Sequence, residues 1–140
     1  MSPLPASPDT PKRLSAEALL DQDAPVETGQ MSNRRVFGHT TQDDGFPDGL
    51  TVNVEGYVWS ARWDGSCVVR HKPDGSGDRR MSLPALKVSS VIFGGRDYRD
   101  LYITTAGGDQ KDTDSQAAGA LFRARPGIGG VQEFLSRMGL

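Results

Sequence analysis

Residues 49–73 read GLTVNVEGYVWSARWDGSCVVRHKP, and residues 90–126 repeat their pattern of short apolar runs. In each stretch, an apolar run is followed by a turn rich in Gly or Asp and then by further apolar runs. Leu50 lies 41 positions before Val91, at matching places in the two stretches. Short runs bounded by Gly, Asp and Pro predict β-strands joined by turns. Each unit therefore consists of strand, turn, strand, turn, strand.

This repeat predicts an all-β fold. A period of this length built from short strands is typical of a β-propeller blade. The first unit continues into a fourth, outer strand, which completes a four-stranded antiparallel blade, and the second unit supplies most of another. The predicted strands are residues 33–37, 50–54, 57–62, 66–71, 79–83, 88–93, 101–105 and 120–124. We therefore predict a partial β-propeller of about two four-stranded antiparallel blades.

The composition divides the chain into three parts. Residues 1–30 combine five prolines with many polar residues. They hold too little apolar surface to offset the entropy of ordering, which predicts a disordered Pro-rich tail. Residues 31–128 carry the strands and form the two-blade propeller fragment. Residues 129–140 form a C-terminal tail, in which apolar residues at helical spacing favour a short helical turn.

The charge and the cysteine content exclude several classes of function. With 16 basic and 18 acidic residues the net charge is -2, and the basic residues are not clustered, so we expect no nucleic-acid partner. No run is apolar enough for a secretory signal or a membrane span, and we expect no membrane contact. The single cysteine, Cys67, has no partner for an intrachain disulfide. These features predict a cytoplasmic protein.

Two Pro-Asp-Gly triplets occur in different contexts. The triplet at residues 73–75 follows a strand and precedes a polar loop, as expected of a hairpin turn. The triplet at residues 47–49 directly precedes the innermost strand of a blade. Inner strands of a propeller start around the central axis, so the carboxylate of Asp48 would point into the axial pocket. Gly49 would allow close backbone approach there. A turn residue and a site residue both remain open interpretations of Asp48.

Residues 45–65 and 88–106 resemble the gluconolactonase and regucalcin family, also called the senescence-marker-protein family. The match covers roughly residues 31–128 and corresponds to the carboxyl-terminal part of the family. The resemblance implies a six-bladed propeller that hydrolyses sugar lactones with one divalent cation, usually calcium, zinc or magnesium. In the family, the aspartate of this Pro-Asp-Gly triplet is a metal ligand and the general base. By this matching, both roles fall on Asp48.

The family's remaining site residues, a glutamate, an asparagine and a substrate-binding arginine, precede the part that matches. The resemblance therefore implies a carboxyl-terminal fragment of a lactone hydrolase, with a sugar lactone as substrate and the missing blades as a partner. Two alternatives remain open. One is a non-catalytic remnant. The other is a ligand-binding module that forms a homo-oligomer, in which three copies of two blades close a six-bladed ring around three Asp48 carboxylates.

Two loops are expected beside Asp48 at the mouth of the pocket. They are residues 62–65, between the second and third strands of the first unit, and the insertion at residues 107–119 in the second unit. The insertion is either a lid over the substrate or a solvated loop, and it lacks the spacing of a calcium-binding loop. Trp63 either stacks on a sugar ring or packs on a neighbouring strand.

The other reactive side chains are expected to be structural. Ser89 and Ser90 start the second inner strand and could face the axis, but no histidine is placed to activate them. His39 and His71 lack a third metal ligand and are predicted to be ordinary surface histidines. Cys67 is predicted to pack inside its blade.

Overall fold

The computed structural model describes residues 18–23, 25, 27–107 and 115–133 of the chain. In these residues the strands, in chain order, are β1 (Ala18–Asp23), β2 (Ser32–His39), β3 (Phe46–Val52), β4 (Val58–Trp63), β5 (Cys67–His71), β6 (Gly77–Ser82), β7 (Lys87–Gly94), β8 (Asp100–Ala106) and β9 (Leu121–Ala124).

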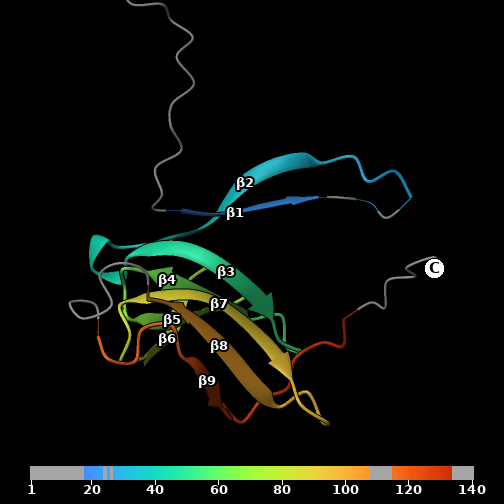
Figure 1. Ribbon diagram of the computed structural model, residues 1–140. Coiled ribbons are helices and arrows are strands. Elements are labelled where there is room, and N and C mark those ends of the chain that lie inside the picture. Colours follow the sequence, from blue (N-terminus) through green and yellow to red (C-terminus); the bar gives the residue numbers. More distant parts are fainter. Residues whose placement is uncertain (1–17, 24, 26, 108–114, 134–140) are drawn as a thin grey trace, which may run out of the picture.

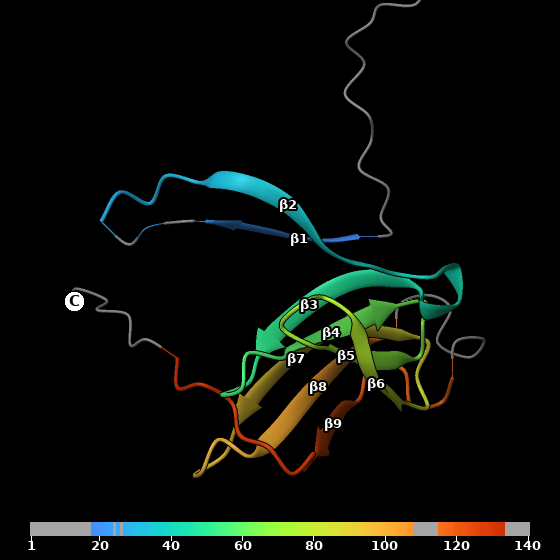
Figure 2. The same ribbon diagram turned by 180° about the vertical axis from the view of Figure 1, so that it is seen from behind.

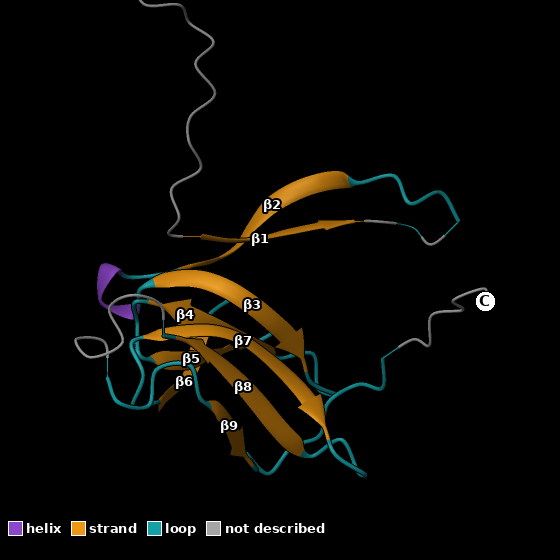
Figure 3. Cartoon of the chain, in the orientation of Figure 1, coloured by secondary structure: helices purple, strands orange, loops and turns teal. Residues whose placement is uncertain are grey.

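The strands form three antiparallel sheets, which Figures 1 and 2 show from two sides. β1 and β2 form the N-terminal hairpin. The first sheet has the order β3-β4-β5-β6, and the second sheet has the order β7-β8-β9. One turn of 3-10 helix, η1 (Gln42–Asp44), connects the hairpin to the first sheet (Figure 3). The prediction of an all-β fold, with one four-stranded antiparallel unit and three strands of a second, is confirmed.

Local interactions set the turns of the first sheet. The buried side chain of Asn53 accepts hydrogen bonds at Oδ1 from the backbone N–H groups of Glu55 and Tyr57, each at 3.0 Å. This geometry replaces the strand pairing and reverses the chain between β3 and β4. Between β4 and β5, Asp64 and Ser66 adopt positive φ angles of 58° and 51°. Such angles match the twist of a tight hairpin connection.

The main core lies between the two larger sheets. Trp59 from β4 meets Phe93 from β7 edge to face, with ring centroids 5.8 Å apart and planes at 86°. Both side chains are almost fully buried. Alternate residues of each strand contribute to the core, as expected of strands with one buried face. The core residues are Trp59, Ala61, Val68, Leu83, Val88, Val91, Phe93, Leu101 and Ile103.

The N-terminal hairpin corrects one prediction. Residues 1–30 were expected to be disordered, but residues 18–23 pair with β2 along a strand. Leu19 is buried, and it lines a groove together with apolar side chains of β3 and β4. Arg35 on β2 also forms ion pairs with Asp21 and Asp23 on β1, at 2.5 and 3.2 Å. Composition could not show these partners, because they lie far away along the chain. Residues 1–17 lie outside the described residues.

The other terminal segment was predicted to be a tail beyond residue 128. Gly130 forms an isolated β-bridge with Asn53, and Val54 donates a backbone hydrogen bond to the carbonyl of Gly129 at 3.1 Å. These contacts attach the end of the second sheet to the turn of the first. A short helical turn was predicted in the tail at residues 129–140, of which residues 129–133 are not helical and the rest lie outside the described range. In the part of the chain that is described, no helix is long and apolar enough to cross a membrane.

Candidate functional site

Asp48 lies within β3 and not in a turn ahead of it. Pro47 pairs with Arg62 and Leu50 pairs with Ser60, so the register of β3 on β4 shifts between Pro47 and Leu50. Asp48 and Gly49 therefore occupy a β-bulge. Bulges change the direction of a side chain and occur often beside active sites. The interpretation of Asp48 as a simple turn residue does not describe this geometry.

The Asp48 carboxylate is exposed. Within the described part of the chain it forms no hydrogen bond or ion pair. The other Pro-Asp-Gly aspartate behaves differently, because Asp74 accepts hydrogen bonds from the backbone N–H and the hydroxyl of Ser76, at 2.9 and 2.6 Å. That triplet forms the predicted turn between β5 and β6. The carboxylate of Asp48 is left available for a ligand.

Gly49 lies where the innermost strands of the two sheets meet. A β-carbon at position 49 would come within 2.7 Å of both Cα and Cβ of Ser90 on β7. Real β-carbon contacts are not this short, so only glycine fits without movement. The expectation of close backbone approach at Gly49 is therefore confirmed. Figure 1 shows β3 and β7 running side by side in the same direction.

β7 carries a bulge at the equivalent place. Its register on β8 shifts between Val88 and Ser90, which leaves Ser89 as the irregular residue. Ser89 lies 41 positions after Asp48, the same offset that relates the two units. Its hydroxyl is 2.9 Å from that of Thr104 on β8, so it has a hydrogen-bond partner in its own sheet. Among the described residues, neither Ser89 nor Ser90 forms a hydrogen bond with a histidine.

The loop at residues 62–65 was predicted to lie beside Asp48. It joins β4 to β5 at the end of the first sheet where β3 begins, because Phe46 of β3 pairs with Trp63. A β-carbon on Gly65 would lie 2.8 Å from the carbonyl carbon of Asp44, so this turn packs closely on η1. Lys87, at the start of β7, has its Nζ 3.9 Å from the Asp64 carboxylate and 6.0 Å from the centroid of Trp63. Lys87 of the neighbouring sheet thus lies over the Trp63 ring, and stacking of this ring on a sugar stays a prediction.

The insertion of the second unit is described only in part, and residues 108–114 lie outside the described residues. It leaves β8 at Ala106, which pairs with Lys87 at the start of β7. It returns at Ser115, whose hydroxyl donates to the carbonyl of Pro84 at 2.6 Å. The described ends of the insertion therefore lie at the end of the sheets where β7 begins. This is the end expected for a loop that borders the pocket.

His71 corrects a second prediction. It was expected to be a surface histidine, but its side chain is only 3% exposed. Arg62 Nη2 donates to His71 Nε2 at 2.7 Å, and His71 Nδ1 donates to the carbonyl of Gly75 at 3.2 Å. Burial is the main cause that lowers the pKa of His71, and it also lowers the pKa of Arg62. His39 is exposed, as predicted.

Sequence reasoning missed the pairing of Arg62 with His71, because both residues lie in polar-looking positions at strand ends. Their positions alternate with the core residues on β4 and β5, which places them on the opposite face of the sheet. That alternation was a usable signal. Cys67 is buried as predicted, and burial raises the pKa of its thiol.

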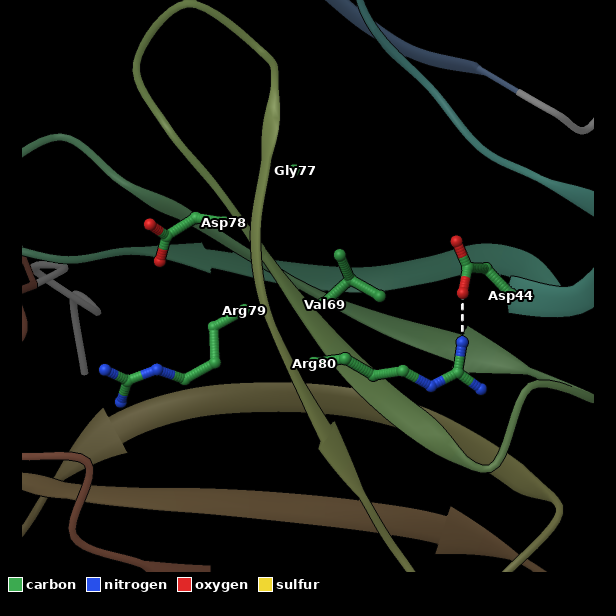
Figure 4. A pocket seen from close by; sticks show the side chains of 6 residues that line it. All are labelled: Asp44, Val69, Gly77, Asp78, Arg79 and Arg80. Atoms are coloured by element: carbon green, nitrogen blue, oxygen red, sulfur yellow. Dashed lines mark hydrogen bonds and ion pairs between the residues drawn. The ribbon is translucent and has the colours of Figure 1, made fainter.

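A second polar region lies along β6, shown in Figure 4. Arg80 forms an ion pair with Asp44 of η1, and its Nη2 donates to the carbonyl of Gly65 at 3.0 Å. The pocket beside them has a volume of about 230 Å³. Its lining residues are Asp44, Val69, Gly77, Asp78, Arg79 and Arg80. Asp48 does not line this pocket, so the pocket is separate from the candidate site.

Metal ligation by the described residues is incomplete. A hard divalent cation prefers about six or more oxygen ligands, several of them from protein. Among the residues that the structure describes, no group of three or more His, Cys, Asp or Glu side chains is arranged to hold a metal ion. Asp48 fits as one ligand of a cation site but not as a whole site.

Two repeated antiparallel sheets that pack face to face and meet along their inner strands define part of a β-propeller. Residues 8–107 match the family described as SMP-30/Gluconolactonase/LRE-like region, and the chain belongs to this family. The resemblance predicted from the sequence is therefore confirmed.

Individual relatives agree with this assignment. Pentonolactonase XacC of Haloferax volcanii is 45% identical over 117 residues, which cover 79% of this chain and 40% of that protein. Regucalcin of Danio rerio is 42% identical over 85 residues, which cover 60% of this chain and 29% of regucalcin. The crystal structure of regucalcin from Agrobacterium tumefaciens, a calcium-binding protein, matches with a TM-score of 0.78 and 28% identity over 88% of this chain and 43% of its own. The chain thus spans less than half the length of these relatives.

Proposed function

We propose that this chain is the carboxyl-terminal part of a hydrolase that opens sugar lactones, with Asp48 as its general base. One observation carries the proposal. Asp48 is an exposed carboxylate, with no ion-pair or hydrogen-bond partner among the described residues, in a bulge of an innermost strand inside the range that matches the family. The similarity to a pentonolactonase supports the substrate class.

The chemistry requires little of this chain beyond a positioned base. A lactone is a cyclic ester, and water attacks its carbonyl carbon. A carboxylate within hydrogen-bond reach of that water accepts its proton as the new C–O bond forms. The proton then passes to the ring oxygen as the ester bond breaks, which yields the open hydroxy acid and restores the carboxylate. Asp48 is proposed to hold this proton between the two steps.

A divalent cation is a second part of the proposal. When bound, it would polarise the lactone carbonyl and stabilise the oxyanion that develops there. A carboxylate oxygen such as that of Asp48 is a ligand that calcium, magnesium and zinc all accept. The additional ligands would come from further propeller blades, either in the same polypeptide or in a partner.

The proposal is tested by lactone hydrolysis with the purified chain, together with the blades that complete the site, and with added calcium, magnesium or zinc. Asp48→Asn keeps the shape of the side chain but removes the base, and turnover should fall by about 10²–10⁴-fold. Asp74→Asn is the matched control, because it changes the other Pro-Asp-Gly aspartate and should leave turnover unchanged. Equal turnover in Asp48→Asn and the wild type would overturn the role of Asp48.

One alternative has support of its own. Ile92 and Leu121 on the second sheet are 49% and 65% exposed, which leaves apolar surface that another sheet could cover. A binding module closed by three copies of the chain would cover it, although such a ring must also accommodate the N-terminal hairpin. Light scattering that gives a trimer, together with no turnover by the wild-type chain, would favour this binding module over the hydrolase. A monomer or an aggregate without turnover would favour a non-catalytic remnant.

A further inference from the structure

The N-terminal hairpin contacts the first sheet at a point where two backbones touch. A β-carbon on Gly75, in the turn between β5 and β6, would lie 2.7 Å from the carbonyl carbon of Phe37 on β2 and still closer to its oxygen. A β-carbon on Gly38 would lie 2.8 Å from the Gly75 oxygen. Small movements of this turn would therefore be transmitted directly to the hairpin.

His71 lies at this contact. Its ring packs edge to face with the ring of Phe37, with centroids 6.4 Å apart and planes at 67°. The Gly75 oxygen that accepts the hydrogen bond of His71 is the same oxygen that Gly38 approaches. One buried imidazole thus holds the turn in the position on which the hairpin rests.

The hydrogen bonds require a neutral imidazole. An arginine side chain only donates hydrogen bonds, so the His71 Nε2 that meets Arg62 must carry a lone pair. The proton of the neutral ring is then on Nδ1, where it is donated to Gly75. A second proton on Nε2 would place two donors and two positive charges against each other in a buried position.

The charges around His71 do not offset that repulsion. Arg62 on β4 is fully buried, and its Nε and Nη1 have no hydrogen-bond partner among the described residues. Asp44 on η1 favours the protonated ring only weakly, since its carboxylate is engaged by Arg80 on β6. Asp74, in the turn itself, is exposed and bonded to Ser76. The hairpin contributes Phe37 and Gly38, which carry no charge.

We propose that His71 is a pH-sensitive clasp, which holds the N-terminal hairpin on the first sheet while it is neutral and releases it when it is protonated. The hairpin covers a groove of about 230 Å³ that includes Leu50 and Val52 of β3, and Figures 1 and 2 show it lying over that strand. Release would open this groove, which lies along β3, the strand that carries Asp48. The clasp does not depend on the proposed enzymatic function.

The direction of the effect follows from linkage. The pKa of His71 in the folded chain is lowered from 6.5, first because of burial and then because of Arg62. In the interval between the lowered value and about 6.5, the released state binds a proton that the docked state does not. Docking is therefore fully stable at neutral pH and weakens as the pH falls through this interval.

Hydrogen exchange of the full chain at several pH values between about 5 and 7.5, corrected for intrinsic exchange rates, tests this proposal. We expect protection of the amides of β1 and β2 to fall several-fold toward the acidic end, while the amides of β7 and β8 stay protected. His71→Gln offers Arg62 an oxygen acceptor but cannot be protonated, and it should remove the pH dependence. His39→Gln, which changes the exposed histidine, should retain it.

Three results would overturn the clasp. The first is hairpin protection in the wild type that does not change with pH. The second is a pH dependence in His71→Gln equal to that of the wild type, and the third is its loss in His39→Gln. If His71→Gln does not fold, the imidazole of His71 can be titrated in the wild type by NMR. A midpoint that does not coincide with the loss of hairpin protection would then reject the proposal.

Discussion

The inner strands of the first and second sheets share a bulge near their start but differ in the side chain that the bulge presents. Both inner strands carry a bulge near their start, at Asp48 and Gly49 in β3 and at Ser89 in β7. In the second sheet the bulge presents a hydroxyl that bonds to Thr104 within the sheet. In the first sheet it presents a carboxylate with no partner among the described residues. The repeat therefore forms a bulge in both inner strands, but only the bulge of β3 carries a side chain suited to act as a base.

The largest stability effect is expected at the contact between the two sheets. Trp59→Ala removes a buried ring that packs on Phe93, and chemical denaturation should show a loss of about 3–5 kcal/mol. Trp63→Ala is the matched control, because Trp63 is only partly buried and should cost about 1 kcal/mol. Similar losses at the two tryptophans would contradict a shared core between the sheets.

A smaller effect is expected where the inner strands meet. Gly49→Ala places a β-carbon against Ser90 and should destabilise the fold by about 1–3 kcal/mol. Gly77→Ala introduces the same atom at a place with no heavy atom within 4 Å, so its stability should stay within about 0.5 kcal/mol of the wild type. Thermal unfolding of the two variants side by side measures the difference. If Gly77→Ala were the more damaging change, the inner strands would not be as close as described.

Arg62→Leu tests what the charge of Arg62 contributes to stability on the face of the first sheet that is opposite the core. It removes a buried guanidinium whose Nε and Nη1 have no hydrogen-bond partner among the described residues, which favours the fold. It also leaves His71 Nε2 without its donor, which opposes this gain. We expect unfolding free energy to change by less than about 1 kcal/mol at neutral pH. The same change should weaken the pH dependence of hairpin docking. A loss of several kcal/mol would show that Arg62 stabilises the fold through more than its hydrogen bond to His71.

A small effect is also expected at Ser89. Ser89→Ala removes the hydrogen bond to Thr104 and should cost about 0.5–1.5 kcal/mol at most, without loss of lactone turnover. Equilibrium unfolding and a turnover assay check the two halves of this expectation. A loss of turnover as large as that of Asp48→Asn would show that both bulges carry chemistry.

The strands of the two larger sheets were predictable because their signals are local. Alternating apolar residues around Val52 and Val91, with Gly and Asp between the runs, encode strand and turn within a few positions. The β1 strand was not predictable in this way, because Leu19 becomes ordered only through partners on other strands. The same holds for His71, whose burial depends on the hairpin that packs beside it.

The site was predictable in part. The position of Asp48 before an inner strand and the family resemblance both indicated the residue. The bulge itself left no sequence signal, since it is a register shift between two strands. Residue types alone also did not distinguish the carboxylate of Asp48, which has no partner among the described residues, from the bonded carboxylate of Asp74.

Exchanging the two bulge residues tests the central claim most directly. Asp48→Ser gives the first bulge the side chain of the second, and lactone turnover should fall by about 10²–10⁴-fold. Adding Ser89→Asp moves the carboxylate to the second bulge, and turnover should not return. Full turnover in Asp48→Ser, or its recovery in the double variant, would contradict the assignment of the chemistry to Asp48.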